Sequence, residues 1–81
     1  MFFSSCAYFN TFFNAKEYFD EAEKIRLEKE GERIPVSAID KYGKSIKKSK
    51  KVISDFPESK YVNSAIILMA KSQFHRQEYD L

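Results

Sequence analysis

Residues that break helices are scarce in this chain, and their positions divide it into three long segments. Of its two glycines and two prolines, Gly31, Pro35 and Pro57 fall between stretches that could each form a long helix. The chain has no Asn-Gly or Asp-Gly pair, which would favour a β-hairpin, and little alternation of apolar and polar residues. We therefore predict an all-α fold with three long helices. Their expected ranges are about 5–30, 35–56 and 60–76.

Apolar residues recur at helical spacing in the first two segments. The first segment places them at alternating steps of four and three residues, at Tyr8, Phe12, Ala15, Phe19 and Ala22. The second repeats this spacing at Ile39, Tyr42, Ile46, Ser49, Ile53 and Phe56. The third is different, because its centre, AIILMA at 65–70, is apolar all round and predicts neighbours on more than one side. The short connections predict that consecutive helices pack antiparallel.

The composition limits the chemistry that the chain can carry. Its single cysteine, Cys6, has no partner for an internal disulfide, and one cysteine with one histidine cannot form a zinc site. The acidic residues from Glu17 to Glu23 give no sign of a buried carboxylate pair for acid–base catalysis. We therefore predict no enzyme activity, no cofactor and no small-molecule substrate. His75 stands alone near a helix end and is predicted to be a surface residue.

Residues 45–81 resemble a tetratricopeptide repeat junction, in which a helix ending in V-I-x-x-F-P is followed by x-S-x-Y-x-x-x-A and an apolar helix. The matching residues are Ile46, Val52, Ile53, Phe56, Pro57, Ser59, Tyr61, Ala65, Leu68, Ala70, Phe74 and Tyr79. The sequence departs from the pattern at Ser45, where alanine is usual, at Ser49, where an aromatic is usual, and at Gln77, where glycine is common. Residues 77–81 are expected to form a turn and the start of a fourth helix, within a longer protein.

Small and aromatic residues support this resemblance, because two triplets share one spacing. They are Ala15, Phe19 and Ala22, and Ala38, Tyr42 and Ser45. The F-P-x-S-x-Y junction is most similar to the BamD-type lipoproteins of the outer-membrane β-barrel assembly machinery and to related periplasmic scaffolds. The N-terminal CAYFNTFFNAKEYFDEAEK also resembles the start of mature envelope lipoproteins that carry such repeats.

The resemblance implies a tetratricopeptide-type α-solenoid of antiparallel helical hairpins over residues 6–81. It implies a non-catalytic scaffold that binds other envelope proteins at the periplasmic face of the bacterial outer membrane. Repeat register implies that Ile67, Lys71 and Phe74, on the first helix of a repeat, line the concave groove that binds the partner. The alternative is a soluble cytoplasmic tetratricopeptide adaptor that has no lipid anchor.

Cys6 is the candidate for lipid attachment. It follows Ser4 and Ser5, and small residues are required before the lipidated cysteine of a bacterial lipoprotein, although Phe3 is bulkier than the usual leucine. From these residues alone, a small buried hydrophobe at a helix start is the favoured interpretation. The lipoprotein resemblance favours lipidation instead, with residues 1–5 as the remnant of a signal peptide. No run in the chain reaches the roughly 18 apolar residues that a membrane span needs.

A cluster of lysines lies in the second segment, away from its apolar stripe. Its members are Lys41, Lys44, Lys47, Lys48, Lys50 and Lys51. The simplest interpretation is a solvated helix face, and the sharper ones are contact with anionic lipid headgroups or with an acidic partner. Nucleic acid is not an expected partner, because no stacking aromatics are interleaved with these lysines. Phe9 and Phe13 lie beside the apolar stripe of the first segment and are candidates for exposure.

Overall fold

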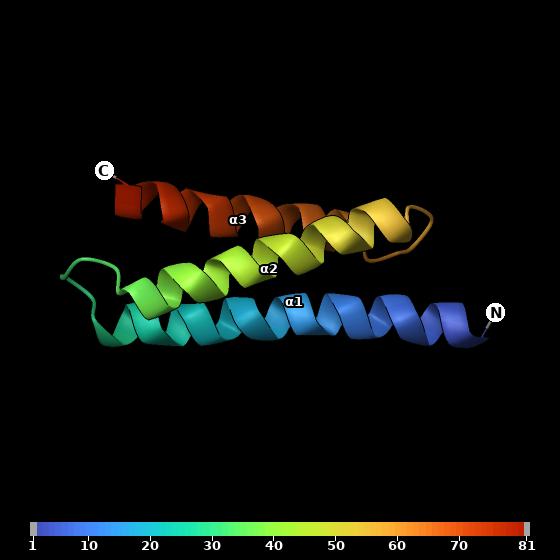
Figure 1. Ribbon diagram of the computed structural model, residues 1–81, viewed down its shortest axis with the longest axis horizontal. Coiled ribbons are helices and arrows are strands. Elements are labelled where there is room, and N and C mark those ends of the chain that lie inside the picture. Colours follow the sequence, from blue (N-terminus) through green and yellow to red (C-terminus); the bar gives the residue numbers. More distant parts are fainter. Residues whose placement is uncertain (1, 81) are drawn as a thin grey trace.

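A computed structural model describes residues 2–80 of the chain, and the side chains of residues 9–76. Residues 2–80 form three helices, α1 (Phe2–Glu28), α2 (Val36–Asp55) and α3 (Val62–Asp80), with no strand among them. Consecutive helices run antiparallel, and α2 lies between α1 and α3 (Figure 1). The molecule measures 46 × 19 × 15 Å along its principal axes. The prediction of an all-α array of helical hairpins is confirmed.

The predicted breakers lie at the helix boundaries. Gly31 has φ +90°, a left-handed conformation that residues with a Cβ rarely adopt, and it follows the last turn of α1. Pro35 is the N-cap of α2, with φ −62° and ψ 149°, so that α2 begins one residue after the proline. At the other connection, Ser59 Oγ accepts a hydrogen bond from the backbone N–H of Tyr61 at 3.0 Å. These local conformations fix where the chain reverses direction.

The C-terminal boundary of α3 differs from the prediction. The expected turn at Gln77 and the start of a fourth helix are wrong, because α3 continues without interruption to Asp80. Residues 77–81 contain neither glycine nor proline, and glutamine and glutamate favour helix interiors. The family resemblance predicts a helix end at this point, but the local sequence contains no residue that would end the helix.

Small residues allow α1 and α2 to approach closely. Ala15 and Ala22 of α1, and Ala38 and Ser45 of α2, are fully buried, as close packing of two helix backbones requires. The hydroxyl of Ser45 donates a hydrogen bond of 2.8 Å to the carbonyl oxygen of Ala15. This bond joins the middle of α1 to the middle of α2, so that the residues after Ser45 run alongside those before Ala15.

Tyr42 occupies the centre of the packed core. Its side chain is fully buried, and its ring meets the Phe19 ring edge to face, with centroids 5.8 Å apart. Ile25 and Ile34 pack against the cluster that Tyr42 forms with neighbouring alanines. Two triplets of equal spacing therefore meet across the interface between α1 and α2, each contributing small residues and one aromatic.

Candidate functional site

The residues expected to bind a protein lie on the outer face of α3. Ile67, Lys71 and Phe74 are separated by four and three residues, a spacing that places them on one side of a helix. All three are exposed, Ile67 to 56% and Phe74 to 59%. Ala65 and Ser72 are fully buried on the other side of α3. We call Ile67, Lys71 and Phe74 the α3 row.

The apolar centre of α3 is buried on one side and exposed on the other among the residues that the structure describes. Ala65 is buried, but Ile66 is 44% exposed and Ala70 is exposed as well. The prediction that this segment has neighbours on more than one side is met in part, because α3 contacts both α2 and α1 but one side of its apolar centre is exposed. The exposed side chains of Ile66 and Ala70 are next to the α3 row in the sequence.

Two phenylalanines of α1 are also exposed, as predicted. Phe9 and Phe13 are 48% and 47% exposed, and their rings stack with centroids 6.1 Å apart and 8° between the planes. Phe9 meets the Tyr61 ring edge to face at 6.0 Å, and Phe12 stacks on the same tyrosine at 4.9 Å. These contacts connect the first half of α1 to the residue that precedes α3.

A polar cluster joins all three helices, and the sequence analysis missed it. Glu23 of α1 accepts hydrogen bonds from the hydroxyl of Tyr42 and from Arg26, whose terminal nitrogen lies 3.1 Å from each carboxylate oxygen. The Nε of Arg26 donates to the Tyr42 hydroxyl at 3.0 Å. His75 of α3 approaches the same carboxylate at 3.4 Å, and its ring stacks on that of Tyr42 at 4.9 Å.

The prediction that His75 is a surface residue is wrong. Its side chain is 16% exposed and lies against Tyr42 and Glu23. The signal available in the sequence was the position of Tyr42 within a buried stripe. A buried tyrosine needs a partner for its hydroxyl, and only tertiary packing reveals that the partner is Glu23.

The charges of this cluster follow from its contacts. Burial alone would raise the pKa of the Glu23 carboxyl. The hydrogen bonds from Arg26 and Tyr42 together outweigh this effect, so that the pKa lies below its usual value. The hydrogen bond to Glu23 raises the pKa of Arg26. Burial, followed by the bond to Glu23, raises the pKa of Tyr42. At neutral pH the cluster therefore holds a carboxylate, a guanidinium and a neutral phenol, which join α1 to α2, and His75 of α3 lies against the carboxylate and the phenol ring.

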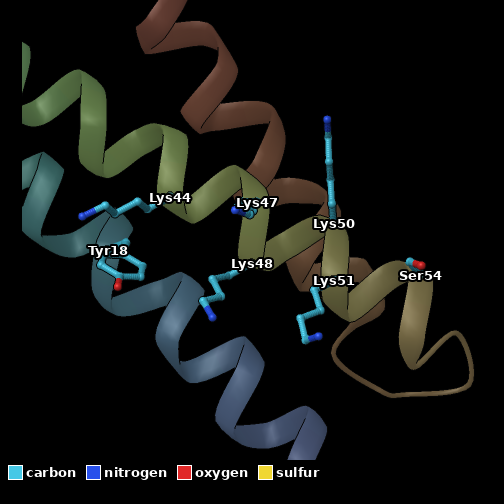
Figure 2. Close-up of a pocket in the computed structure, with 7 residues that line it drawn as sticks. All are labelled: Tyr18, Lys44, Lys47, Lys48, Lys50, Lys51 and Ser54. Carbon is cyan, nitrogen blue, oxygen red and sulfur yellow. The ribbon is translucent and has the colours of Figure 1, made fainter.

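The predicted basic face lies on the side of α2 that is opposite its buried residues. We keep the name basic face for Lys41, Lys44, Lys47, Lys48, Lys50 and Lys51. Five of these lysines, all except Lys41, line an open hollow of about 600 Å³ together with Tyr18 and Ser54 (Figure 2). Figure 2 shows Lys48 and Lys51 extending to the side where α1 runs, whereas Lys50 extends to the opposite side. The lysines therefore cover a wide arc of the helix.

Some of these lysines have partners. Lys41 pairs with Glu21 of α1 at 2.8 Å, a hydrogen bond that raises the pKa of Lys41, and Lys51 pairs with Asp55 at 3.2 Å. The ammonium groups of Lys41 and Lys44 lie 5.5 and 5.6 Å from the centre of the Tyr18 ring. Within the described part of the chain, the lysines without a carboxylate partner are Lys44, Lys47, Lys48 and Lys50.

Cys6 lies in the first turns of α1, and its side chain is outside the described residues. Residues 2–5, expected to be the remnant of a signal, are the helical start of α1. Lipidation of Cys6 therefore stays a prediction.

Among the described residues, no group of three or more His, Cys, Asp and Glu side chains is placed to hold a metal ion. None of the helices in residues 2–80 combines the length and the apolar character that crossing a membrane requires. Comparisons with protein-family models, with curated proteins and with solved structures find no match for this chain.

Proposed function

We propose that this chain is a non-catalytic tetratricopeptide-type scaffold that presents the α3 row to a protein partner in the bacterial envelope. The observation that carries the proposal is the exposure of Ile67 and Phe74, at 56% and 59%, on the face of α3 that α2 leaves uncovered. Large apolar side chains grouped on one exposed face are typical of interaction surfaces. Lys71, between them, adds a positive charge.

The packing of α3 against the other helices supports the same role. His75 holds α3 against Glu23 and Tyr42, and it lies one turn from Lys71. A surface whose backbone is already ordered loses little conformational entropy when it binds. A partner of matching chemistry is a helical or extended segment with apolar side chains to cover Ile67 and Phe74 and an acidic group opposite Lys71.

Charge reversal at Lys71 tests the surface. Lys71→Glu should weaken capture of the cognate envelope partner at least about fivefold in a pull-down, since it replaces attraction by repulsion. Its matched control is Lys24→Glu, which makes the same charge change at an exposed position of α1. Equal capture by the two variants, with helicity unchanged in circular dichroism, would exclude the α3 row as the binding surface.

The proposed location is the periplasmic face of the outer membrane, with Cys6 as the lipid attachment point. The support for this location is the lipoprotein-like Ser-Ser-Cys sequence, and acyl chains contribute about 0.8 kcal/mol for each buried CH₂ group. Intact-mass spectrometry of the native protein should show an acylated N-terminal Cys6. An unmodified Cys6 still preceded by residues 3–5 would reject the anchor.

The second candidate is a soluble cytoplasmic tetratricopeptide adaptor without a lipid anchor. It needs the same α3 row, because both proposals use the same helix packing. Membrane fractionation separates them, since the anchored protein remains with membranes in high salt and the Cys6→Ser variant does not. Native protein found only in the soluble cytoplasmic fraction would select the adaptor.

A further inference from the structure

The basic face of α2 carries more positive charge than its ion pairs neutralise. Four of its lysines, Lys44, Lys47, Lys48 and Lys50, have no carboxylate partner within the described residues. Glu21 pairs with Lys41 and Asp55 with Lys51. The exposed Asp40 precedes Lys44 by one helical turn, and no carboxylate is among the described residues that line the hollow. The hollow that these lysines line is therefore a region of uncompensated positive charge (Figure 2).

We propose that the basic face of α2 binds the surface of a membrane that contains anionic phospholipids. The inference adds an orientation to the proposed envelope scaffold. It rests neither on acylation of Cys6 nor on a protein bound at the α3 row.

The spread of the lysines favours a broad, charged surface over a narrow ligand. Lys48 and Lys50 extend to opposite sides of α2, so that the positive charge is spread over the width of the helix and is not concentrated at one point. The ammonium groups end long flexible stems, and a layer of separate headgroups can meet each of them without a fixed geometry. The face contains no arginine, which is the residue that holds carboxylate or phosphate in a planar two-point contact.

Nucleic acid fits this face less well. Single strands bind through aromatic rings on which the bases stack, and Tyr18 is the aromatic residue lining the hollow. The ammonium groups of Lys41 and Lys44 lie close to that ring. These two ammonium groups would compete with a base for the Tyr18 ring.

The basic face adjoins the end of α1 that carries Cys6. The hydrogen bond from Ser45 to the Ala15 carbonyl fixes the antiparallel register, so that residues 47–51 run alongside the part of α1 that precedes Ala15. Figure 1 shows the start of α1 and the last turns of α2 at the same end of the molecule. A lipid on Cys6 and the lysines of α2 would therefore approach one membrane together.

This contact would leave the α3 row available. The lysines lie on the side of α2 opposite its buried residues Ala38, Tyr42, Ser45 and Ser49, which pack toward the other helices. The α3 row lies on a different helix, on the side opposite the buried residues Ala65 and Ser72. This placement allows membrane contact and capture of a partner at one time.

Vesicle binding by the full chain with Cys6→Ser tests the proposal without an acyl group. Each lysine near an anionic surface raises the partition coefficient about fivefold, so four independent lysines raise it on the order of a thousandfold. Sedimentation with vesicles that contain phosphatidylglycerol should show binding at low salt that is lost at high salt. Vesicles of phosphatidylcholine alone should bind at least tenfold less protein.

Lys47→Glu/Lys48→Glu should reduce this binding at least tenfold. Its matched control is Lys24→Glu/Lys29→Glu, which has the same net charge and changes two exposed lysines away from the basic face. The control should lose less than threefold. If the first variant loses helicity, Lys47→Gln/Lys48→Gln replaces it, with an expected loss of at least fivefold. Equal binding by variant and control would overturn the proposal.

Two further outcomes would also overturn it. One is equal binding to the two kinds of vesicle. The other is tighter binding of a labelled oligoglutamate or of a single-stranded oligonucleotide than of anionic vesicles, with that binding lost in Lys47→Glu/Lys48→Glu. The first result would show that the lysine charge does not drive membrane binding, and the second would assign that charge to a different partner.

A probe of orientation separates membrane contact from loose electrostatic attraction. A fluorophore attached at Ser54→Cys, which lines the hollow, should be quenched by nitroxide-labelled lipid headgroups in anionic vesicles. The same fluorophore at Gln73→Cys, an exposed position of α3, should be quenched at least threefold less. Equal quenching at the two positions would contradict the proposed orientation.

Discussion

The hydroxyl of Tyr42 donates a hydrogen bond to the carboxylate of Glu23, which precedes it by 19 residues. Arg26 and His75 contact the same carboxylate, so that one acidic side chain connects all three helices. Removal of the hydroxyl takes a donor from Glu23 and an acceptor from Arg26. We expect Tyr42→Phe to lower the free energy of unfolding by about 1 to 2 kcal/mol, measured by urea denaturation.

The matched control for Tyr42→Phe is Tyr18→Phe. Tyr18 is a half-buried tyrosine of α1 whose hydroxyl has no hydrogen bond to the described residues. This substitution should change the free energy of unfolding by less than about 0.5 kcal/mol. Similar losses in both variants would show that the bond to Glu23 contributes nothing specific.

The contribution of Glu23 should depend on pH. Its pKa in the folded chain lies below the ordinary value of 4.5, so the folded state binds the Glu23 proton less readily than the unfolded state. The stability that Glu23 supplies is therefore fully present above about pH 4.5 and is lost as the pH falls through the lower folded value. We expect Glu23→Gln to lower the free energy of unfolding by about 1 kcal/mol at pH 7, with this difference shrinking toward pH 3.

Urea denaturation at several pH values measures this difference. The control is Glu17→Gln, which removes an exposed carboxylate of the same helix that has no ion pair within the described residues. A difference between wild type and Glu23→Gln that stays constant from pH 7 to pH 3 would contradict the assigned role of the Glu23 charge.

The two glycines should respond in opposite ways to alanine. Gly43 lies inside α2, where an added Cβ would come no closer than 3.6 Å to the guanidinium of Arg76, an ordinary van der Waals distance. Gly43→Ala should therefore raise the free energy of unfolding by about 0.5 to 1 kcal/mol, because alanine favours helices. Gly31→Ala should lower it by about 1 kcal/mol, since Gly31 has φ +90°. Thermal denaturation would contradict the account if both substitutions acted in the same direction.

Two buried serines of α2, Ser45 and Ser49, should respond in opposite ways to alanine. Ser45 bonds to the Ala15 carbonyl, whereas the fully buried hydroxyl of Ser49 has no hydrogen-bond partner among the residues that the structure describes. Ser45→Ala should lower the free energy of unfolding by about 1 kcal/mol, and Ser49→Ala should raise it by about 0.5 kcal/mol. Urea denaturation of the two variants compares them directly. A loss for Ser49→Ala as large as that for Ser45→Ala would indicate that Ser49 has a partner.

The helices and the small residues of their core could be predicted from local sequence. Gly31, Pro35 and Pro57 mark the connections, and the shared spacing of Ala15 and Ala22 with Ala38 and Ser45 identifies the residues that meet. Both signals depend on local conformation and helical periodicity, which neighbouring residues determine. The family resemblance does not predict the end of α3, because residues 77–80 contain no helix breaker and the helix continues to Asp80.

The polar cluster could not be predicted in this way. His75 lies 52 residues after Glu23, and no local pattern relates them, because their contact depends on α3 packing beside α1. Exposure of the α3 row followed from helical register, which separates its positions from those of Ala65 and Ser72. Recognition of a partner stays a prediction, since it depends on a molecule whose sequence is unknown.

The central claim is that the α3 row is a protein-binding surface, and site-specific photo-crosslinking tests it most directly. A photoreactive phenylalanine at position 67 or 74 should give one discrete adduct in intact cells, and Lys71→Glu should remove that adduct. The same probe at Lys24, exposed on α1, should give no such adduct. No adduct at positions 67 and 74, or the same adduct at position 24, would contradict the claim.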